Sequence, residues 1–137
     1  MQKTGLFVEK DNGDLIDRFY NRIMFPIRNQ QGKTVGFSGR IFQQDTEGAP
    51  KYLNSPETQL FNKRNILFNF DLARASIRRE KEVILFEGFM DVIGAWQAGV
   101  TNGIASMGTS LTNEQIHLID RVTDHVLIAY DGDSAGI

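Results

Sequence analysis

Apolar residues cluster in two short segments near the start of the chain, with four polar or small residues between them. Residues 23–28 and 33–42 are rich in β-branched and aromatic side chains, which favours strands. The residues between them, Asn29 to Gly32, are typical of a tight turn, so the sequence predicts a β-hairpin. Pro26 lacks a backbone donor, which predicts an edge position or a bulge for the first strand. Residues 43–62 are polar and predict an irregular connection.

From residue 69 onward the apolar pattern alternates between helix and strand. Val83–Phe86 is an all-apolar run, as expected for a strand that is buried on both faces. Thr112 and Gln115 have the spacing of a capping box that opens a helix. The predicted elements are a helix over 69–81, a strand over 83–86, a helix around 92–96 that ends near Gly99, a strand over 103–107, a helix containing Ile116 and Ile119, and a strand over 125–130.

This alternation predicts a parallel sheet with right-handed crossovers. The expected fold class is therefore α/β: an N-terminal α+β part that carries the hairpin is followed by a parallel βαβαβ sheet. The chain has 137 residues, of which 41% are hydrophobic, enough for one core of ordinary size.

Composition excludes several kinds of site. The chain has no cysteine, which excludes disulfides, thiolate zinc sites and cysteine nucleophiles, and it has only two histidines. No apolar run approaches the 18 residues of a membrane span, and the first residues lack the layout of a signal peptide. The expected location is the cytoplasm, with no membrane partner.

The net charge of −2 conceals two unlike halves. Residues 1–80 carry 13 Lys and Arg against 9 Asp and Glu, a net charge of +4. Residues 81–137 carry 2 against 8, a net charge of −6. This difference predicts a division into 1–80 and 81–137, with a polyanion bound by the first part and cations by the second. Ordinary solvated surface charge is the alternative explanation.

Four acids fall where a parallel sheet would gather them. Glu87 follows the first predicted strand of the sheet, Asp131 and Asp133 follow the last, and Asp91 lies one helical turn beyond Glu87. Ligands bind at the carboxyl edge of such sheets, and carboxylates that converge there repel one another without a cation. Oxygen ligands alone favour Mg²⁺ or Mn²⁺ over zinc.

Other interpretations of the Asp131–Gly136 segment exist. Most Asp-Gly-Asp tripeptides are simple turns. A calcium loop is rejected because Ala135 stands where a ligand is needed and the preceding segment is strand-like. Paired aspartates also occur in haloacid-dehalogenase-type phosphotransferases, but there the motif opens its domain.

An ordered series of motifs resembles the catalytic core of bacterial DnaG-type primases. Asp17–Ile27 reads DRFYNRIMFPI and closely resembles the DRFxNRIMFPI segment of that family. Glu87–Asp91 reads EGFMD and resembles its EGYMD motif, with Phe in place of Tyr, and Asp131–Gly136 resembles its DGDxAG motif. These last two motifs together are the signature of a Toprim domain. Further matching segments, in the same order, are Ser38–Arg40, Lys51–Thr58 and Phe61–Lys63.

The resemblance implies an activity and a set of residues. Such primases copy single-stranded DNA into short RNA primers from ribonucleoside triphosphates. It implies that Glu87, Asp131 and Asp133 are catalytic and bind Mg²⁺ or Mn²⁺, with Asp91 as an accessory carboxylate. The positions implied to hold template and nucleotide are Arg22, Arg40, Lys51, Asn54 and Lys63.

The sequence also departs from the family. It contains nothing similar to the zinc ribbon, to the domain that contacts the replicative helicase, or to a third acidic cluster. We therefore expect a truncated piece of the catalytic core, without zinc and inactive by itself. Two alternatives remain open: a non-catalytic fragment that binds single-stranded DNA and metal, and another Toprim protein of topoisomerase or nuclease type.

Overall fold

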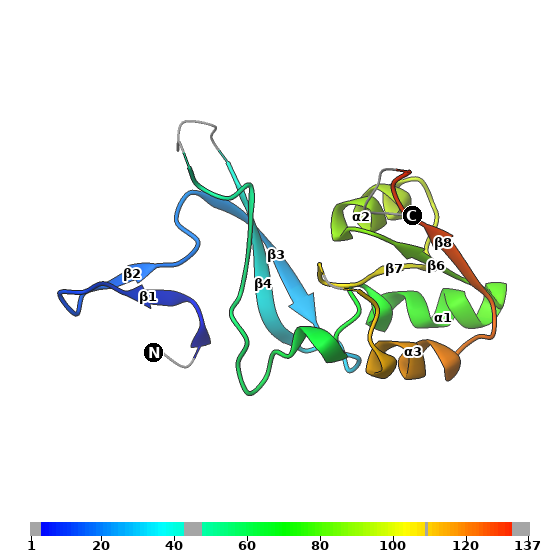
Figure 1. The fold of residues 1–137 in the computed structure, drawn as a ribbon. Coiled ribbons are helices and arrows are strands. Elements are labelled where there is room, and N and C mark those ends of the chain that lie inside the picture. The colour runs from blue at the N-terminus through cyan, green and yellow to red at the C-terminus, as the bar shows by residue number, and fades with distance from the viewer. Residues whose placement is uncertain (1–3, 43–47, 109, 133–137) are drawn as a thin grey trace. The chain divides into compact units, whose positions relative to one another are not determined.

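The chain folds into two compact units in a computed structural model that describes residues 4–42, 48–108 and 110–132 (Figure 1). Unit 1 comprises residues 1–27 and 34–62, and unit 2 comprises residues 28–33 and 63–137. The backbone passes between the units at 27/28, at 33/34 and at 62/63. The tip of the predicted hairpin therefore belongs to unit 2, although most of its two strands belong to unit 1.

Unit 1 is built from antiparallel strands. β1 (Phe7–Glu9) pairs with β2 (Leu15–Asp17), and a second sheet has the order β3-β4-β5. The three strands of that sheet are β3 (Arg22–Arg28), β4 (Thr34–Ile41) and β5 (Tyr52–Asn54). The predicted hairpin is confirmed, and Pro26 lies in the edge strand β3, as expected.

The prediction of an irregular connection over 43–62 is wrong at Tyr52–Asn54, which form β5. This strand has only three residues, and it is fixed by pairing with β4 rather than by its own apolar pattern. The hydroxyl of Ser55 extends the attachment by accepting a hydrogen bond from the backbone N–H of Phe37 at 2.9 Å. β1 and β2, also three residues each, were not predicted for the same reason.

Glycines let large side chains pack closely onto β4. Gly39 lies under Phe19, and a Cβ atom at this position would come within 2.8 Å of the Phe19 ring. Gly36 lies under Phe61 in the same way, with a closest approach of 3.1 Å. Both phenylalanines are buried, so these two glycines define where the small core of unit 1 can form.

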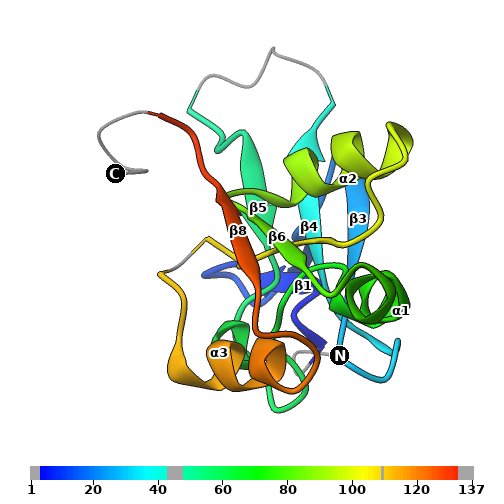
Figure 2. The ribbon, with the colours of Figure 1, turned by 90° about the vertical axis from the view of Figure 1, so that its right-hand side faces the viewer.

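Unit 2 contains a parallel sheet of three strands in the order β7-β6-β8. Figure 2 shows β8 beside β6 in this sheet. In chain order its elements are the short 3₁₀ helix η2 (Lys63–Asn65), α1 (Phe70–Glu80), β6 (Val83–Phe86), α2 (Phe89–Gln97), β7 (Gly103–Ala105), α3 (Asn113–Asp120) and β8 (Val126–Ala129). The predicted helix–strand alternation and the parallel sheet are confirmed. The capping box is confirmed too: Thr112 Oγ1 accepts from the Gln115 backbone, and Gln115 Oε1 accepts from the Thr112 backbone.

The core of unit 2 lies on one face of β6. Val83 and Leu85 are buried, whereas Ile84 and Phe86 on the opposite face are only half-buried. The prediction that β6 is buried on both faces is therefore wrong, because helices cover one face more completely than the other. The buried cluster comprises Leu67, Phe70, Ala73, Ile77, Val83, Leu85, Ile104 and Ile119.

No helix in the described ranges is long and apolar enough to cross a membrane.

Candidate functional site

Two of the predicted acids meet at the carboxyl edge of the parallel sheet. Glu87 directly follows β6, and Asp131 lies two residues beyond β8, the neighbouring strand. The Glu87 carboxylate accepts a hydrogen bond from the backbone N–H of Asp131 at 3.2 Å. Glu87 is half-buried and Asp131 is exposed, so a ligand can reach both from solvent. The parallel register thus brings together two residues that lie 44 positions apart.

Asp91 has a local structural role. It lies in the first turn of α2, and its Oδ2 accepts a hydrogen bond from the backbone N–H of Gly88 at 3.2 Å. A carboxylate in this position stabilises the start of a helix. The helix begins directly after Gly88, so this cap fixes the backbone that follows Glu87.

Tyr130 was not among the predicted site residues. It lies between β8 and Asp131 and packs in part against the core. Its burial, followed by the negative charge of Glu87, raises the pKa of the Tyr130 phenol above its ordinary value of 10.0. The Tyr130 phenol therefore lies close enough to the Glu87 carboxylate for that charge to oppose its ionisation. The only sequence signal for Tyr130 is its position next to Asp131.

Asp133 lies outside the described residues, so its position relative to Glu87 is left as a prediction. Within the described ranges no three acidic or histidine side chains come together as a metal site. The carboxylates of Glu87 and Asp131 offer oxygen donors alone, which fits a hard divalent cation better than zinc.

Two basic residues of unit 1, Arg40 and Lys51, lie beside one aromatic ring, that of Tyr52. Arg40 on β4 is paired in register with Tyr52 on β5. The Arg40 guanidinium lies 5.9 Å from the centre of the Tyr52 ring, and Lys51 Nζ lies 5.9 Å from the same centre. Arg40 and Lys51 are exposed, and Tyr52 is 37% exposed. Two cations beside an aromatic face can hold phosphate and stack a base.

Sequence analysis did not single out Tyr52. The pairing of β4 with β5 brings it opposite Arg40, and that register is not visible in the order of residues along the chain. The surrounding Lys51–Thr58 motif indicates the neighbourhood but not the partner.

The side chain of Arg22 donates hydrogen bonds to the backbone of unit 1. Its Nη1 donates to the carbonyl oxygens of Gly39 at 3.1 Å and of Pro50 at 2.9 Å. The backbone carbonyl of Asn54 is likewise engaged, by the Arg18 guanidinium at 3.0 Å. These contacts join β3, β4 and the segment before β5, which gives Arg22 a clear structural role in shaping the surface that carries Arg40.

Lys63 belongs to unit 2, in η2. Its carbonyl oxygen accepts from Nε2 of Gln115, which also donates to Ile66. Gln115 is fully buried, so η2 is fastened to the start of α3. Of the five basic or polar positions predicted to bind nucleic acid, four therefore lie in unit 1 and Lys63 lies in the unit of the acids.

Two family models match consecutive parts of this chain. Residues 1–74 match the model "DNA primase catalytic core, N-terminal domain", and residues 84–137 match the model "Toprim-like". The DNA primase of Enterococcus faecalis is 63% identical to this chain over 139 aligned positions, which cover 99% of the chain. They cover 22% of that relative, so the chain spans about a fifth of the length of the curated proteins it resembles.

Solved structures show the same likeness. The primase of Aquifex aeolicus, described with its zinc-binding and RNA polymerase domains, has a TM-score of 0.90 at 36% identity. The match covers 98% of this chain and 33% of that one. A DnaG primase catalytic domain bound to single-stranded DNA has a TM-score of 0.87 at 41% identity, covering 98% of this chain and 41% of its own.

Proposed function

The chain belongs to the DnaG-type DNA primase family, and on that premise we propose that it takes part in the synthesis of short RNA primers on single-stranded DNA. One observation carries the proposal: the Glu87 carboxylate and the Asp131 backbone meet at the carboxyl edge of the parallel sheet. The match of residues 1–74 to a primase model supports this activity over that of a topoisomerase or nuclease.

Glu87, Asp131 and Asp133 are the proposed ligands for Mg²⁺ or Mn²⁺, with Asp91 as an accessory carboxylate that caps α2. When bound, such ions lower the pKa of an attacking hydroxyl and neutralise charge on a triphosphate. The residues of the chain provide the oxygen donors and position them through the register of β6 and β8. Ribonucleoside triphosphates are the proposed substrates.

Template binding is assigned to the basic face of unit 1, with Arg40, Lys51 and Asn54 as contacts, Arg22 as a support, and Lys63 as a contact from unit 2. Lys and Arg contacts to phosphate position a strand without reading its sequence. Tyr52 is added here as a surface on which a base can stack, supported by the two cations close to its ring.

We also propose where the protein acts and what its partner is. The chain acts in the cytoplasm during DNA replication, and a replicative helicase is the expected partner of the whole protein. The division at residue 80 between a basic part and a Toprim part stays a proposal. We also infer that these 137 residues make no primers by themselves. The exposed apolar side chains of β8 support this view, because they leave the strand that precedes Asp131 with little packing to hold it in place.

Primer synthesis tests the proposal most directly. These 137 residues would replace the matching segment of the Enterococcus faecalis primase, and labelled ribonucleotides would be followed on single-stranded DNA. The chimera should make primers, and Glu87→Gln should abolish synthesis. Glu82→Gln is the matched control, because Glu82 lies at the opposite end of the same strand and should leave synthesis unchanged. Full activity of the Glu87→Gln chimera would refute the assignment.

DNA binding tests the basic face separately. Binding of a single-stranded oligonucleotide should weaken steeply with salt, and removal of one phosphate contact should lower the slope of log K against log salt by about 0.7. Arg40→Ala and Lys51→Ala should each have this effect. Lys33→Ala, an exposed charge on the hairpin tip, should leave the slope unchanged. Equal effects at all three positions would indicate diffuse attraction instead of a defined track.

A further inference from the structure

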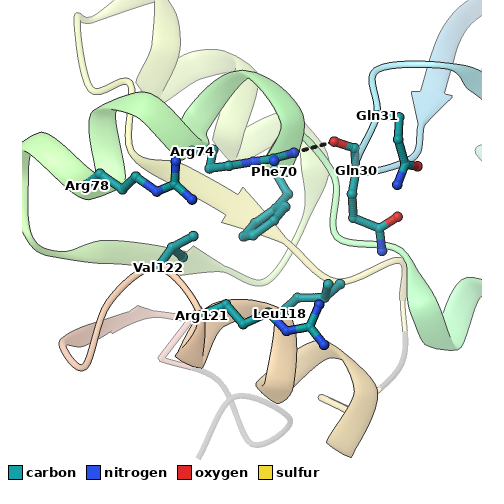
Figure 3. A pocket seen from close by; sticks show the side chains of 8 residues that line it. All are labelled: Gln30, Gln31, Phe70, Arg74, Arg78, Leu118, Arg121 and Val122. Atoms are coloured by element: carbon teal, nitrogen blue, oxygen red, sulfur yellow. Dashed lines mark hydrogen bonds between the residues drawn. The ribbon is translucent and has the colours of Figure 1, made fainter.

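Unit 2 contains a cavity of about 490 Å³ that none of the assigned functions uses. It lies between α1 and α3, and the hairpin tip closes one end (Figure 3). This volume is in the range of pockets that take small organic ligands. Neither Glu87 nor Asp131 lines it, so the cavity is distinct from the acidic edge of the sheet.

Three arginines line this cavity: Arg74 and Arg78 from α1, and Arg121 from the end of α3. No Asp or Glu is among its described lining residues. The nearby carboxylate of Asp71 is already paired with Arg28 at 3.0 Å. Three guanidinium groups around one space repel one another, and an anion placed among them relieves that repulsion.

Arg74 is held in place before any ligand arrives. Its guanidinium lies 5.6 Å from the centre of the Phe70 ring, and its Nη2 donates to the carbonyl oxygen of Gln30 (Figure 3). Its Nε atom is buried and has no hydrogen-bond partner among the residues that the structure describes. A buried hydrogen-bond donor without a partner lowers the stability of a folded protein, and such groups are rare. A ligand that accepts a hydrogen bond from Arg74 would account for this one.

The wall opposite the helices is fixed as well. Gln30 Nε2 donates to the carbonyl oxygen of Asn65 at 3.0 Å, and the Arg28–Asp71 ion pair fastens the same tip to α1. A preformed rim lowers the entropy that a ligand must overcome on binding.

We propose that this cavity binds a small polyphosphate anion, either free or as the phosphate chain of a nucleotide. The charge requires an anion, and three separate guanidinium groups suit several phosphates better than a single carboxylate. Phe70, Leu118 and Val122 supply an apolar wall that an attached base can contact. Because the site shares no residue with the acidic edge or with the basic face of unit 1, it does not depend on the proposed function.

Helix stabilisation is the competing explanation for two of the arginines. Arg78 lies in the last turn of α1, and Arg121 caps the end of α3, where positive charge stabilises a helix. Arg79 provides a matched control. It lies in the same last turn, but it pairs with Glu80 at 2.9 Å and does not line the cavity.

The test measures binding of tripolyphosphate and of ATP to the chain by calorimetry, in EDTA and without DNA. The double variant Arg78→Gln/Arg121→Gln should bind tripolyphosphate about tenfold more weakly or worse, since two charged contacts are lost. Arg79→Gln should bind as the unsubstituted chain does. The three substituted arginines, Arg78, Arg79 and Arg121, are exposed, so their variants should fold, which circular dichroism checks.

Each outcome decides the proposal. Tighter binding of ATP than of tripolyphosphate supports a nucleotide as ligand, and equal binding supports the phosphate chain alone. The proposal is overturned if neither anion binds, or if the double variant and Arg79→Gln lose affinity equally. A separate titration with single-stranded DNA adds one more outcome. The proposal is also overturned if the double variant loses affinity for that DNA but for neither anion, because the arginines would then form part of a nucleic-acid track.

Discussion

β7 and β8 flank the same strand, β6, and both run parallel to it, yet their surroundings differ sharply. All three residues of β7 are buried, whereas Val126, Leu127 and Ile128 of β8 are 45%, 51% and 64% exposed. The outer edge of β7 is also bridged by Phe68, whose N–H donates to the Ala105 carbonyl at 2.8 Å. In the described residues no strand pairs with the outer edge of β8.

The contrast shows that pairing and burial contribute separately to a sheet. Both outer strands hydrogen-bond to β6 along their inner edges, but β7 alone adds a large apolar contribution. β7 is covered because α1 and α2 both contact it. We therefore expect the stability of unit 2 to depend much more on β7 than on β8.

Truncation of one side chain in each strand gives the largest expected difference. Ile104→Ala on β7 should lower the free energy of unfolding by about 2–5 kcal/mol, because Ile104 is completely buried in the core cluster. Leu127→Ala on β8 should cost less than about 1 kcal/mol, since half of that side chain is already in water. Urea unfolding measures both, and similar losses would show that the two edges are equally supported.

Adding side-chain volume, instead of removing it, should also cost more stability at β7 than beside β8. A Cβ atom at Gly103, the first residue of β7, would lie 2.8 Å from the ring of Phe86. Gly103→Ala should therefore cost about 1–3 kcal/mol by overpacking, and Phe86→Leu in the same chain should recover part of that loss. Gly132, just beyond β8, has no described atom within 4 Å of such a Cβ, so Gly132→Ala should change the unfolding free energy by less than about 0.5 kcal/mol.

Self-association tests the uncovered strand directly. Exposed apolar strands without a neighbour favour edge-to-edge contact between molecules. We therefore expect the unsubstituted chain to self-associate through β8. Ile128→Lys should shift its sedimentation coefficient towards that of a monomer with little loss of stability. Val8→Lys places a charge on β1, where the residue is 39% exposed, and should not change association. If Val8→Lys alone disperses the chain, then β8 is not the contact.

The smallest expected effect is on the pH dependence of stability. It should be the same in the β7 and β8 variants, so pH should not change the difference between the two strands. A hydrogen bond from the backbone N–H of Glu114 at the start of α3, followed by the charge of Arg64, holds the pKa of the Glu114 carboxyl below its usual 4.5. A lowered pKa in the folded state contributes stability above the ordinary pKa, and that contribution is lost as the pH falls through the folded value. NMR titration of Glu114 should show this midpoint, and Glu114→Gln should make the acid dependence slightly less steep in β7 and β8 variants alike. A midpoint above 4.5 would contradict it.

The longer elements of unit 2 were predictable because local pattern and final environment agree. The spacing of Thr112 and Gln115 alone predicts the start of α3, and the apolar run at 83–86 predicts β6. The burial of β6 was harder to predict, because which face a helix covers depends on contacts far apart in the sequence. The short strands β1, β2 and β5 have too few residues for any period to show, so only their partners define them.

The candidate site divides in the same way. The rule that parallel strands end at one edge predicts the neighbourhood of Glu87 and Asp131, which the structure places within one hydrogen bond of each other. Their metal-binding role stays a prediction, as does that of Asp133. Tyr52 was missed because its position beside Arg40 comes from strand register, and the arginine cavity was missed because its walls come from two helices and a hairpin tip.

The three backbone passages between the units have a mechanical consequence. In a protein whose two parts share a single linker, one cut by a protease releases them as separate pieces. Here a cut between residues 62 and 63 leaves the units joined at 27/28 and at 33/34. The segment between those two passages is itself anchored in unit 2 by the Arg28–Asp71 pair. A nicked chain should therefore migrate as two fragments only after denaturation, and its units should remain tethered in native buffer.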